Sequence, residues 1–213
     1  MNETTKNLKL TRRLAITGAF SALVIVLGIT RLGFITIGSV ASITILHVPV
    51  ILICMLAGLP EGLFVGAAFG ILSLILASMS PSSVLDPFFV NPLFSVVPRM
   101  LIAFVAWGLW KVLKLIPHLP KTVAAGITAF ITTIVHTLLV LGFIYIFKGT
   151  DIRAALNGLG FIGLLVANAV NVIFEALAAT LICTAVFAGL FVADNKKPKL
   201  SEEDNQENTQ EKN

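Results

Sequence analysis

Charged residues are scarce in this sequence and unevenly placed. Asp, Glu, Lys and Arg make up 12% of the 213 residues, against 57% for hydrophobic residues, whereas a soluble domain is usually about a quarter charged. Several of the stretches without a charge are long enough for a helix to cross a bilayer, which takes about 20 residues. This excludes an ordinary soluble protein and predicts a membrane protein. The uncharged stretches are residues 14–30, 32–60, 62–85, 122–147 and 154–174.

These stretches also lack the alternation of polar and apolar residues that a membrane β-barrel requires. Segments that are apolar all round favour helices, which satisfy their own backbone hydrogen bonds in lipid. We therefore predict an all-α integral membrane protein, with residues 1–193 forming a single six-transmembrane-helix bundle. Residues 194–213 are polar with almost no apolar side chains, so we expect a disordered cytoplasmic tail. The predicted helices are 11–30, 40–59, 61–78, 94–114, 122–147 and 161–193.

The sequence has no motif of an enzyme, a metal centre or a nucleotide site. It contains no HExxH, no Cys and His cluster with zinc spacing, and no Gly-rich turn followed by Lys and Ser or Thr. Cys54 and Cys183 lie inside apolar stretches, where cysteine behaves as a small buried hydrophobe. We expect no catalysis, no metal and no cofactor. Since the basic residues cluster at helix ends, the net charge of +4 does not indicate nucleic-acid binding.

The distribution of Lys and Arg predicts the orientation, because cytoplasmic connections carry an excess of these residues. With the N-terminus inside, the outer segments hold three basic residues, Arg31, Lys148 and Arg153. The inner segments hold Lys6, Lys9, Arg12, Arg13, Lys111, Lys114, Lys121, Lys196, Lys197, Lys199 and Lys212. We therefore predict that both termini are cytoplasmic and that the connections 78–93 and 148–160 face outside.

The outer connection 78–93 is long, and long connections in compact proteins are usually functional or disordered. Phe88 and Phe89 give it apolar side chains to pack, so we expect an ordered lid over an outward-facing site. Both rings are candidates to close over the apolar body of a ligand. Asn91, which comes just before the fourth predicted helix, is a candidate to contact the ligand from the lid.

Ionisable and polar residues inside membrane helices are costly and are therefore candidates for a functional site. Arg99 lies about one turn into the fourth helix and is either an anion anchor or a side chain that extends to the outer interface. Asn168, Asn171 and Glu175 are spaced so that they share one face of the sixth helix. They face either a ligand or neighbouring helices, where they would form interhelical hydrogen bonds.

Two histidines add to the candidate site. His136 is central in the fifth predicted helix and is surrounded by threonines, and His47 begins the core of the second helix. Each is either a ligand contact or a structural hydrogen bonder. The first helix carries a different feature: Ala15 and Ala19 form an AxxxA, and Gly18 and Ala22 continue the small surface. Small residues four apart allow close approach of helices, either within the bundle or against another subunit.

A six-helix chain of this length, with AxxxA in the first helix, resembles the S components of energy-coupling factor (ECF) transporters. The stretch from the second helix into the third strengthens the resemblance, through Leu32-Gly33-Phe34-Ile35-Thr36-Ile37-Gly38, Ile43-Thr44-Ile45-Leu46-His47-Val48-Pro49-Val50 and Gly62-Leu63-Phe64-Val65-Gly66-Ala67-Ala68-Phe69-Gly70-Ile71-Leu72-Ser73. The likeness covers roughly residues 10–192.

The resemblance implies a vitamin-binding subunit in the cell membrane, in contact with lipid, which works with a shared transmembrane coupling subunit and two ATPases. It implies that the partner subunits, rather than this chain, use ATP. Riboflavin binders of the family tend to carry an acidic residue before the Val-Pro pair, where this chain has His47. His-Val-Pro together with Arg99 looks closer to the pantothenate binders, and pantothenate carries a carboxylate that a cation would bind.

Pantothenate is thus the favoured vitamin, with vitamin B6 precursors, folate and riboflavin as alternatives. A different class is a self-sufficient secondary transporter that uses Glu175 or His136 as a proton relay. A purely structural membrane subunit is disfavoured by the long outer connections and by the polar stripe on the sixth helix. Dependence on a coupling module distinguishes the S component from the secondary transporter.

Overall fold

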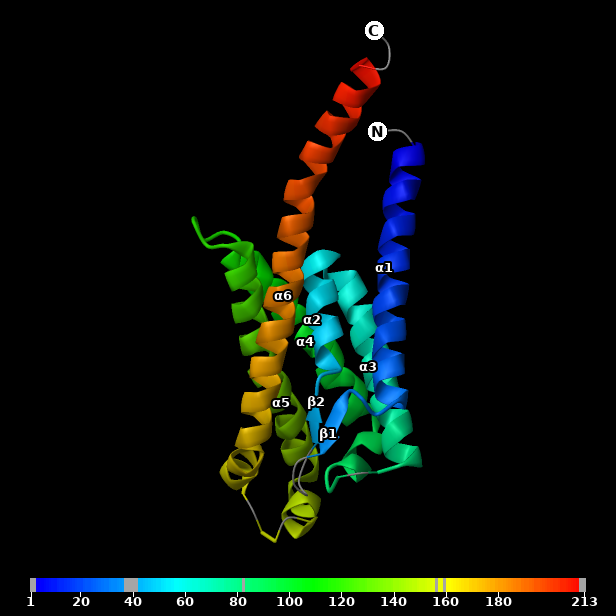
Figure 1. Cartoon of the computed structure of the whole chain (residues 1–213). Coiled ribbons are helices and arrows are strands. Elements are labelled where there is room, and N and C mark those ends of the chain that lie inside the picture. Colours follow the sequence, from blue (N-terminus) through cyan, green and yellow to red (C-terminus); the bar gives the residue numbers. More distant parts are fainter. Residues whose placement is uncertain (1–2, 37–41, 82, 156, 159, 211–213) are drawn as a thin grey trace.

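The computed structural model describes residues 3–36, 42–81, 83–155, 157–158 and 160–210, and it is a helical bundle with both chain ends on the same side (Figure 1). Two short strands and a 3-10 helix accompany the helices. In chain order, the described elements are α1 (Glu3–Ile29), β1 (Phe34–Thr36), β2 (Ser42–Thr44), α2 (His47–Leu56), α3 (Leu59–Met79), η1 (Asp86–Val90), α4 (Pro92–Leu113), α5 (Lys121–Ala155) and α6 (Phe161–Gln210).

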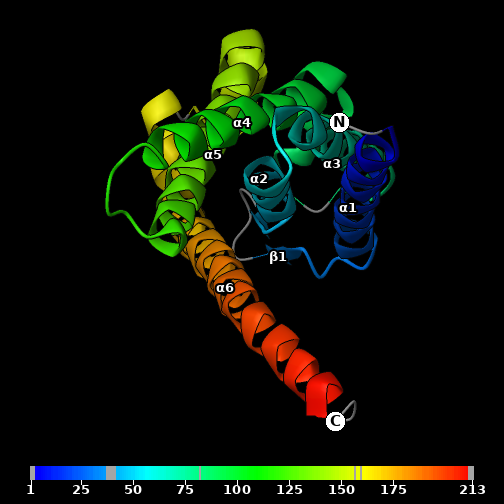
Figure 2. The ribbon, with the colours of Figure 1, turned by 90° about the horizontal axis from the view of Figure 1, so that it is seen from above.

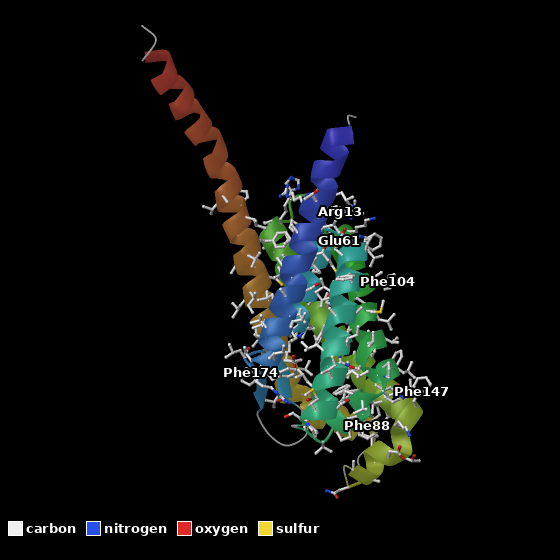
Figure 3. All side chains as sticks on the ribbon, turned by 90° about the vertical axis from the view of Figure 1, so that its right-hand side faces the viewer. Arg13, Glu61, Phe88, Phe104, Phe147 and Phe174 are labelled. Atoms are coloured by element: carbon white, nitrogen blue, oxygen red, sulfur yellow. The ribbon has the colours of Figure 1, made fainter. Side chains whose placement is uncertain are left out.

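The membrane class predicted from the sequence is confirmed. Five of the described helices are long and apolar enough to cross a bilayer. Their outer surfaces are rich in exposed apolar side chains, such as Phe64, Phe104 and Phe174 at 62%, 48% and 54% exposure, which suits contact with lipid (Figure 3). The five spans are Leu10–Ile29, Leu59–Met79, Pro92–Leu113, Lys121–Ala155 and Phe161–Ala193.

The second predicted helix, 40–59, is wrong in extent. The observed α2 has 10 residues, which span about 15 Å at 1.5 Å per residue, only half of a hydrocarbon core of about 30 Å. It therefore does not cross the membrane by itself. All its residues except Leu56 are buried, and it contacts the other five helices. In Figure 2 it lies inside the ring formed by its neighbours.

A β-hairpin replaces the missing first part of that helix. β1 and β2 pair in antiparallel register, with Phe34 opposite Thr44 and Thr36 opposite Ser42. Both strands contain β-branched residues, whose stiff side chains favour extended backbone. The amide of Ile45 then donates to the carbonyl of Gly33 at 3.0 Å. The hairpin is thereby closed just before α2 begins at His47.

Three other helices depart from the predicted bounds. α1 begins at Glu3 rather than at residue 11. α5 continues past residue 147 to Ala155, with a break in helical geometry at Lys148 (φ −135°, ψ 30°). The apolar part of α6 ends at Ala193, in agreement with the predicted span. The helix itself continues to Gln210, where the sequence predicts a disordered tail. The division of the chain into a domain 1–193 and a tail 194–213 stays a prediction.

Glycines on one face of α3 allow α4 to approach closely. Gly62, Gly66 and Gly70 are four residues apart, a spacing that places small residues on one helix face. A Cβ atom added at Gly66 would lie 2.6 Å from the carbonyl oxygen of Arg99, and one added at Gly70 would lie 2.5 Å from the Cα of Val96. This backbone contact fixes the half of α4 that carries Arg99.

We expect Gly66→Ala to destabilise the protein, although alanine is intrinsically better than glycine in a helix by about 1 kcal/mol. The new methyl group would collide with backbone, and overpacking of this kind costs typically about 1–3 kcal/mol. Gly108→Ala in α4 is the matched control, because an added Cβ there meets nothing within 4 Å. The midpoint temperature of thermal unfolding in detergent should fall for Gly66→Ala and should stay unchanged or rise for Gly108→Ala. Equal midpoints would contradict the close contact.

The connection between α3 and α4 is ordered in its described part, as the sequence predicts. Its η1 segment packs on an apolar cluster formed at the end of the bundle away from the chain termini. Phe88 and Phe89 lie against this cluster, whose buried members are Leu85, Phe94, Val140, Leu141, Ile144, Ile152 and Leu164.

Candidate functional site

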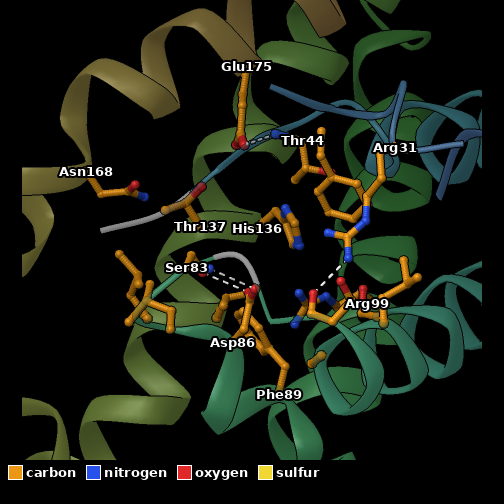
Figure 4. A pocket seen from close by; sticks show the side chains of 18 residues that line it. Arg31, Thr44, Ser83, Asp86, Phe89, Arg99, His136, Thr137, Asn168 and Glu175 are labelled. Carbon is orange, nitrogen blue, oxygen red and sulfur yellow. Dashed lines mark hydrogen bonds between the residues drawn. The ribbon is translucent and has the colours of Figure 1, made fainter. Parts of the chain in front are cut away.

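A cavity lies between the hairpin, the α3–α4 connection and the halves of α3, α4, α5 and α6 that are distant from the chain termini (Figure 4). It encloses ≈ 770 Å³ of space between atoms, including its open mouth. Its polar lining residues are Arg31, Thr44, Ser73, Ser80, Ser83, Asp86, Arg99, His136, Thr137, Asn168 and Glu175.

Arg99 is the buried cation of this cavity. Arg99 is only 5% exposed, and its Nη1 donates to the carbonyl of Phe94 at 2.8 Å. The guanidinium lies between two rings, 4.5 Å from the centroid of Phe89 and 5.4 Å from that of Phe69. Its Nε atom has no hydrogen-bond partner. The alternative that this side chain extends to the outer interface is therefore wrong.

No carboxylate within the described residues forms an ion pair with Arg99; the ion pairs found there join Arg13 to Glu61 and Lys148 to Asp151. Asp86 and Glu175 line the same cavity and interact with Arg99 electrostatically without forming an ion pair. The guanidinium therefore keeps donors for a ligand, and its shape suits a carboxylate bound through two of them. The geometry of Arg99 thus fits an anion anchor.

The polar stripe on α6 faces the bundle rather than lipid. Asn168, Asn171 and Glu175 are each only 5–7% exposed. Glu175 accepts a hydrogen bond from the backbone amide of Thr44 at 2.6 Å, which ties the hairpin to α6. Asn171 Nδ2 donates to Asn168 Oδ1 at 3.1 Å. The cavity is lined by Asn168 and Glu175 and not by Asn171, so the stripe combines a structural role with a place in the site.

The two histidines lie side by side, with ring centroids 5.3 Å apart. His47 is fully buried, and its Nε2 is 2.9 Å from the hydroxyl of Thr133. It does not line the cavity. His136 lines it, is 4% exposed, and has no hydrogen-bond partner on either ring nitrogen. The structural role predicted as the alternative thus fits His47, whereas His136 faces the cavity.

Two residues that we expected at the ligand have other positions. Asn91 is exposed and caps the N-terminus of α4, where its Oδ1 accepts from the amide of Leu93 at 2.9 Å. Phe88 packs on the apolar cluster beneath η1 and does not line the cavity. Phe89, by contrast, lines the cavity and covers the guanidinium of Arg99.

The sequence analysis missed several polar residues of the cavity. Arg31 donates through Nη2 to the carbonyl of Ser80 at 2.7 Å and joins the end of α1 to the end of α3. Ser83 donates through its amide and its hydroxyl to the two carboxylate oxygens of Asp86, at 2.9 and 2.7 Å. Arg31 and Asp86, like Lys148 and Arg153, flank the uncharged stretches on the predicted outer side. That position is the signal that could have found them.

The small residues of α1 are exposed rather than packed inside the bundle. Ala15, Ala19 and Ala22 are all exposed, and an added Cβ at the neighbouring Gly18 meets nothing within 4 Å. The alternative of packing within the bundle is therefore wrong for these residues. Their role in binding another subunit stays a prediction.

A family model described as "ECF transporter, substrate-specific component" matches residues 12–190. The chain belongs to this family. As an S component it is a transport protein and not an enzyme, and its apolar spans make it a multi-pass protein of the cell membrane. This confirms the resemblance drawn from the sequence.

Two known proteins are similar to this S component. One is the pantothenic acid transporter PanT of Lactococcus lactis subsp. cremoris, 29% identical over 167 residues, which cover 71% of this chain and 79% of the relative. The other is the pantothenate transporter PanT of Leuconostoc mesenteroides subsp. mesenteroides, 30% identical over 190 residues. Those residues cover 83% of this chain and 90% of the relative.

Proposed function

We propose that this S component binds pantothenate outside the cell and delivers it to the cytoplasm. The buried guanidinium of Arg99, which forms no ion pair with a carboxylate among the described residues, carries the proposal. Pantothenate has one carboxylate, and its other polar groups are neutral. The names of the two relatives support the same vitamin over vitamin B6 precursors, folate and riboflavin.

In this proposal the ligand's carboxylate binds Arg99, and the ring of Phe89 lies over the guanidinium as part of the lid. Charge-assisted hydrogen bonds are about twice as strong as neutral ones, and burial keeps water from competing with them. The neutral part of the vitamin then occupies the cavity between α5 and α6. Asn168 and Glu175 line that region.

Transport in this proposal requires partners. The chain carries no nucleotide-binding motif, so we propose that two ATPases act through a shared transmembrane coupling subunit. The exposed face of α1 formed by Ala15, Ala19 and Ala22 is the proposed contact with the coupling subunit. Small side chains allow two helix backbones to approach closely in lipid.

Uptake of isotope-labelled pantothenate tests this function in cells that lack their own pantothenate uptake. We expect uptake only when the S component and a coupling module are expressed together. Mutating the ATPase active sites should abolish it, since this chain has no energy source of its own. Uptake by the S component alone, abolished by a proton ionophore, would show a secondary transporter instead.

We propose that both termini are cytoplasmic and that the cavity opens outside. Cysteine labelling in intact cells with a membrane-impermeant maleimide tests this orientation. Native Cys54 and Cys183 are 1% and 0% exposed, so the background should be low. We expect Asn157→Cys to react in intact cells and His118→Cys to react only after permeabilisation, because these exposed positions lie in connections at opposite ends of the bundle. The reverse pattern would invert the orientation.

A further inference from the structure

We propose that His136 forms a neutral polar subsite that selects ligands carrying hydroxyl groups as well as a carboxylate. The inference rests on the proposed function, because it assumes that Arg99 holds the carboxylate. It adds a second requirement on the ligand. An aliphatic carboxylate of the same size should bind less well than a hydroxylated one.

The first support is the state of the His136 ring. His136 is 4% exposed, and neither its Nδ1 nor its Nε2 has a hydrogen-bond partner. Buried polar atoms in folded proteins are bonded in the large majority of cases, and each unmet one destabilises the fold. Two unmet nitrogens on one ring that lines a cavity point to a ligand that bonds them.

The second support is that the neighbouring rings hold His136 without bonding it. Its centroid lies 5.3 Å from that of His47 and 6.1 Å from that of Phe69, within the range of tilted aromatic pairs. Figure 4 shows His136 in the cavity between Thr137 and Arg99. Its position is therefore set by packing, while its nitrogens stay available to the ligand.

His47 is held in place by groups other than His136. Its Nε2 lies 2.9 Å from the hydroxyl of Thr133, which donates to the carbonyl of Ala129 at 2.8 Å. Neither ring nitrogen of His136 has a hydrogen-bond partner, so His47 contacts that ring by packing alone. His47 is thus a positioning residue for His136.

The chemistry of the ring defines the ligand group. A neutral imidazole offers one donor and one acceptor. The hydroxyls of a ligand offer both in return, whereas a carboxylate offers acceptors only and would leave one nitrogen unmet. Arg99 supplies donors only, so it suits the carboxylate. The two anchors thus divide the ligand into an anionic end and a neutral end.

Both anchors lie against the same ring, which limits the length of the ligand. The guanidinium carbon of Arg99 is 5.4 Å from the centroid of Phe69, and the His136 centroid is 6.1 Å from it. A ligand that contacts both Arg99 and His136 must therefore carry its neutral polar group close to its carboxylate. Pantothenate, with an amide and two hydroxyls, meets this requirement.

Isothermal titration of the detergent-purified full chain tests the subsite with two ligands. One is pantothenate, and the other is N-(3,3-dimethylbutanoyl)-β-alanine, which keeps the carboxylate and the amide but lacks both hydroxyls. We expect the wild-type protein to bind the analogue at least about tenfold more weakly, because a site built to hydrogen-bond a hydroxyl rejects a ligand without it. In His136→Phe we expect the two affinities to come within about twofold.

Two further variants separate the subsite from general damage. His136→Gln keeps a donor and an acceptor and should retain part of the discrimination, whereas His136→Leu should lose it as His136→Phe does. Arg99→Gln should weaken both ligands by the same factor and leave their ratio unchanged. Because the ratio comes from one protein sample, partial misfolding changes it little.

The outcomes distinguish the inference from the proposed function. Equal binding of the two ligands by the wild-type protein would overturn the subsite alone. A wild-type ratio that survives both His136→Phe and His136→Leu would also overturn it. Failure of the wild-type protein to bind pantothenate at all would overturn the proposed function, and the subsite with it.

Discussion

Pantothenate affinity should fall at least about tenfold when Arg99 is replaced by alanine. A hydrogen bond to a charged group contributes about 1.5–3 kcal/mol, and about 1.4 kcal/mol corresponds to a factor of ten in the dissociation constant. Because Arg99 is 5% exposed, water cannot replace it at the carboxylate. Arg99→Lys keeps the charge but cannot bind a carboxylate in the bidentate way of arginine. The pantothenate affinity of this variant should therefore lie between those of the wild type and Arg99→Ala.

Isothermal titration on the purified variants measures this effect. Arg153→Ala is the control, since Arg153 is exposed and bonds the hydroxyl of Tyr145 outside the cavity. It should bind pantothenate as the wild type does. An unchanged dissociation constant in Arg99→Ala, with the unfolding midpoint also unchanged, would remove Arg99 from the site.

The second large effect is expected at the exposed small-residue face of α1. Ala19→Trp should abolish association with the coupling subunit and therefore vitamin uptake, because an indole prevents close approach of a partner helix. Pantothenate binding by the purified chain should stay near normal, since Ala19 is exposed and outside the cavity. Co-purification of the coupling subunit and titration of the vitamin measure the two properties separately.

The control for this variant is Ala185→Trp, which places the same bulky side chain at an exposed alanine of α6. It should leave co-purification largely intact. A wild-type yield of coupling subunit with Ala19→Trp would show that this face of α1 is not the contact.

The sequence predicts the spanning helices well and the hairpin not at all. Long apolar stretches identify the five spans, because only a helix satisfies its backbone in lipid. The hairpin strands lie inside such a stretch, 32–60, and apolarity alone does not separate a buried strand from a buried helix. The available signals were the alternation of polar and apolar residues in Ser42-Ile43-Thr44 and the β-branched residues in both strands. The expectation of a full-length second helix outweighed it.

The candidate site is predictable where a polar residue is rare for its surroundings. Arg99, His136 and Glu175 stand out because charge and imidazole are costly in a membrane helix, and the structure brings all three to one cavity. Asn91 was predicted to contact the ligand, but an asparagine before a proline is also a helix N-cap signal, and the N-cap is the role it has. Contacts such as that between Glu175 and the Thr44 amide join distant parts of the chain, and no local pattern encodes them.

The decisive measurement for the proposed site is titration of pantothenate into the unmodified, detergent-purified chain. We expect saturable binding with one vitamin per chain, without any coupling subunit or ATP, because the cavity and its cation belong to this chain alone. Riboflavin and pyridoxine should give no saturable heat under the same conditions. Saturable binding of one of those vitamins, with none for pantothenate, would contradict the account.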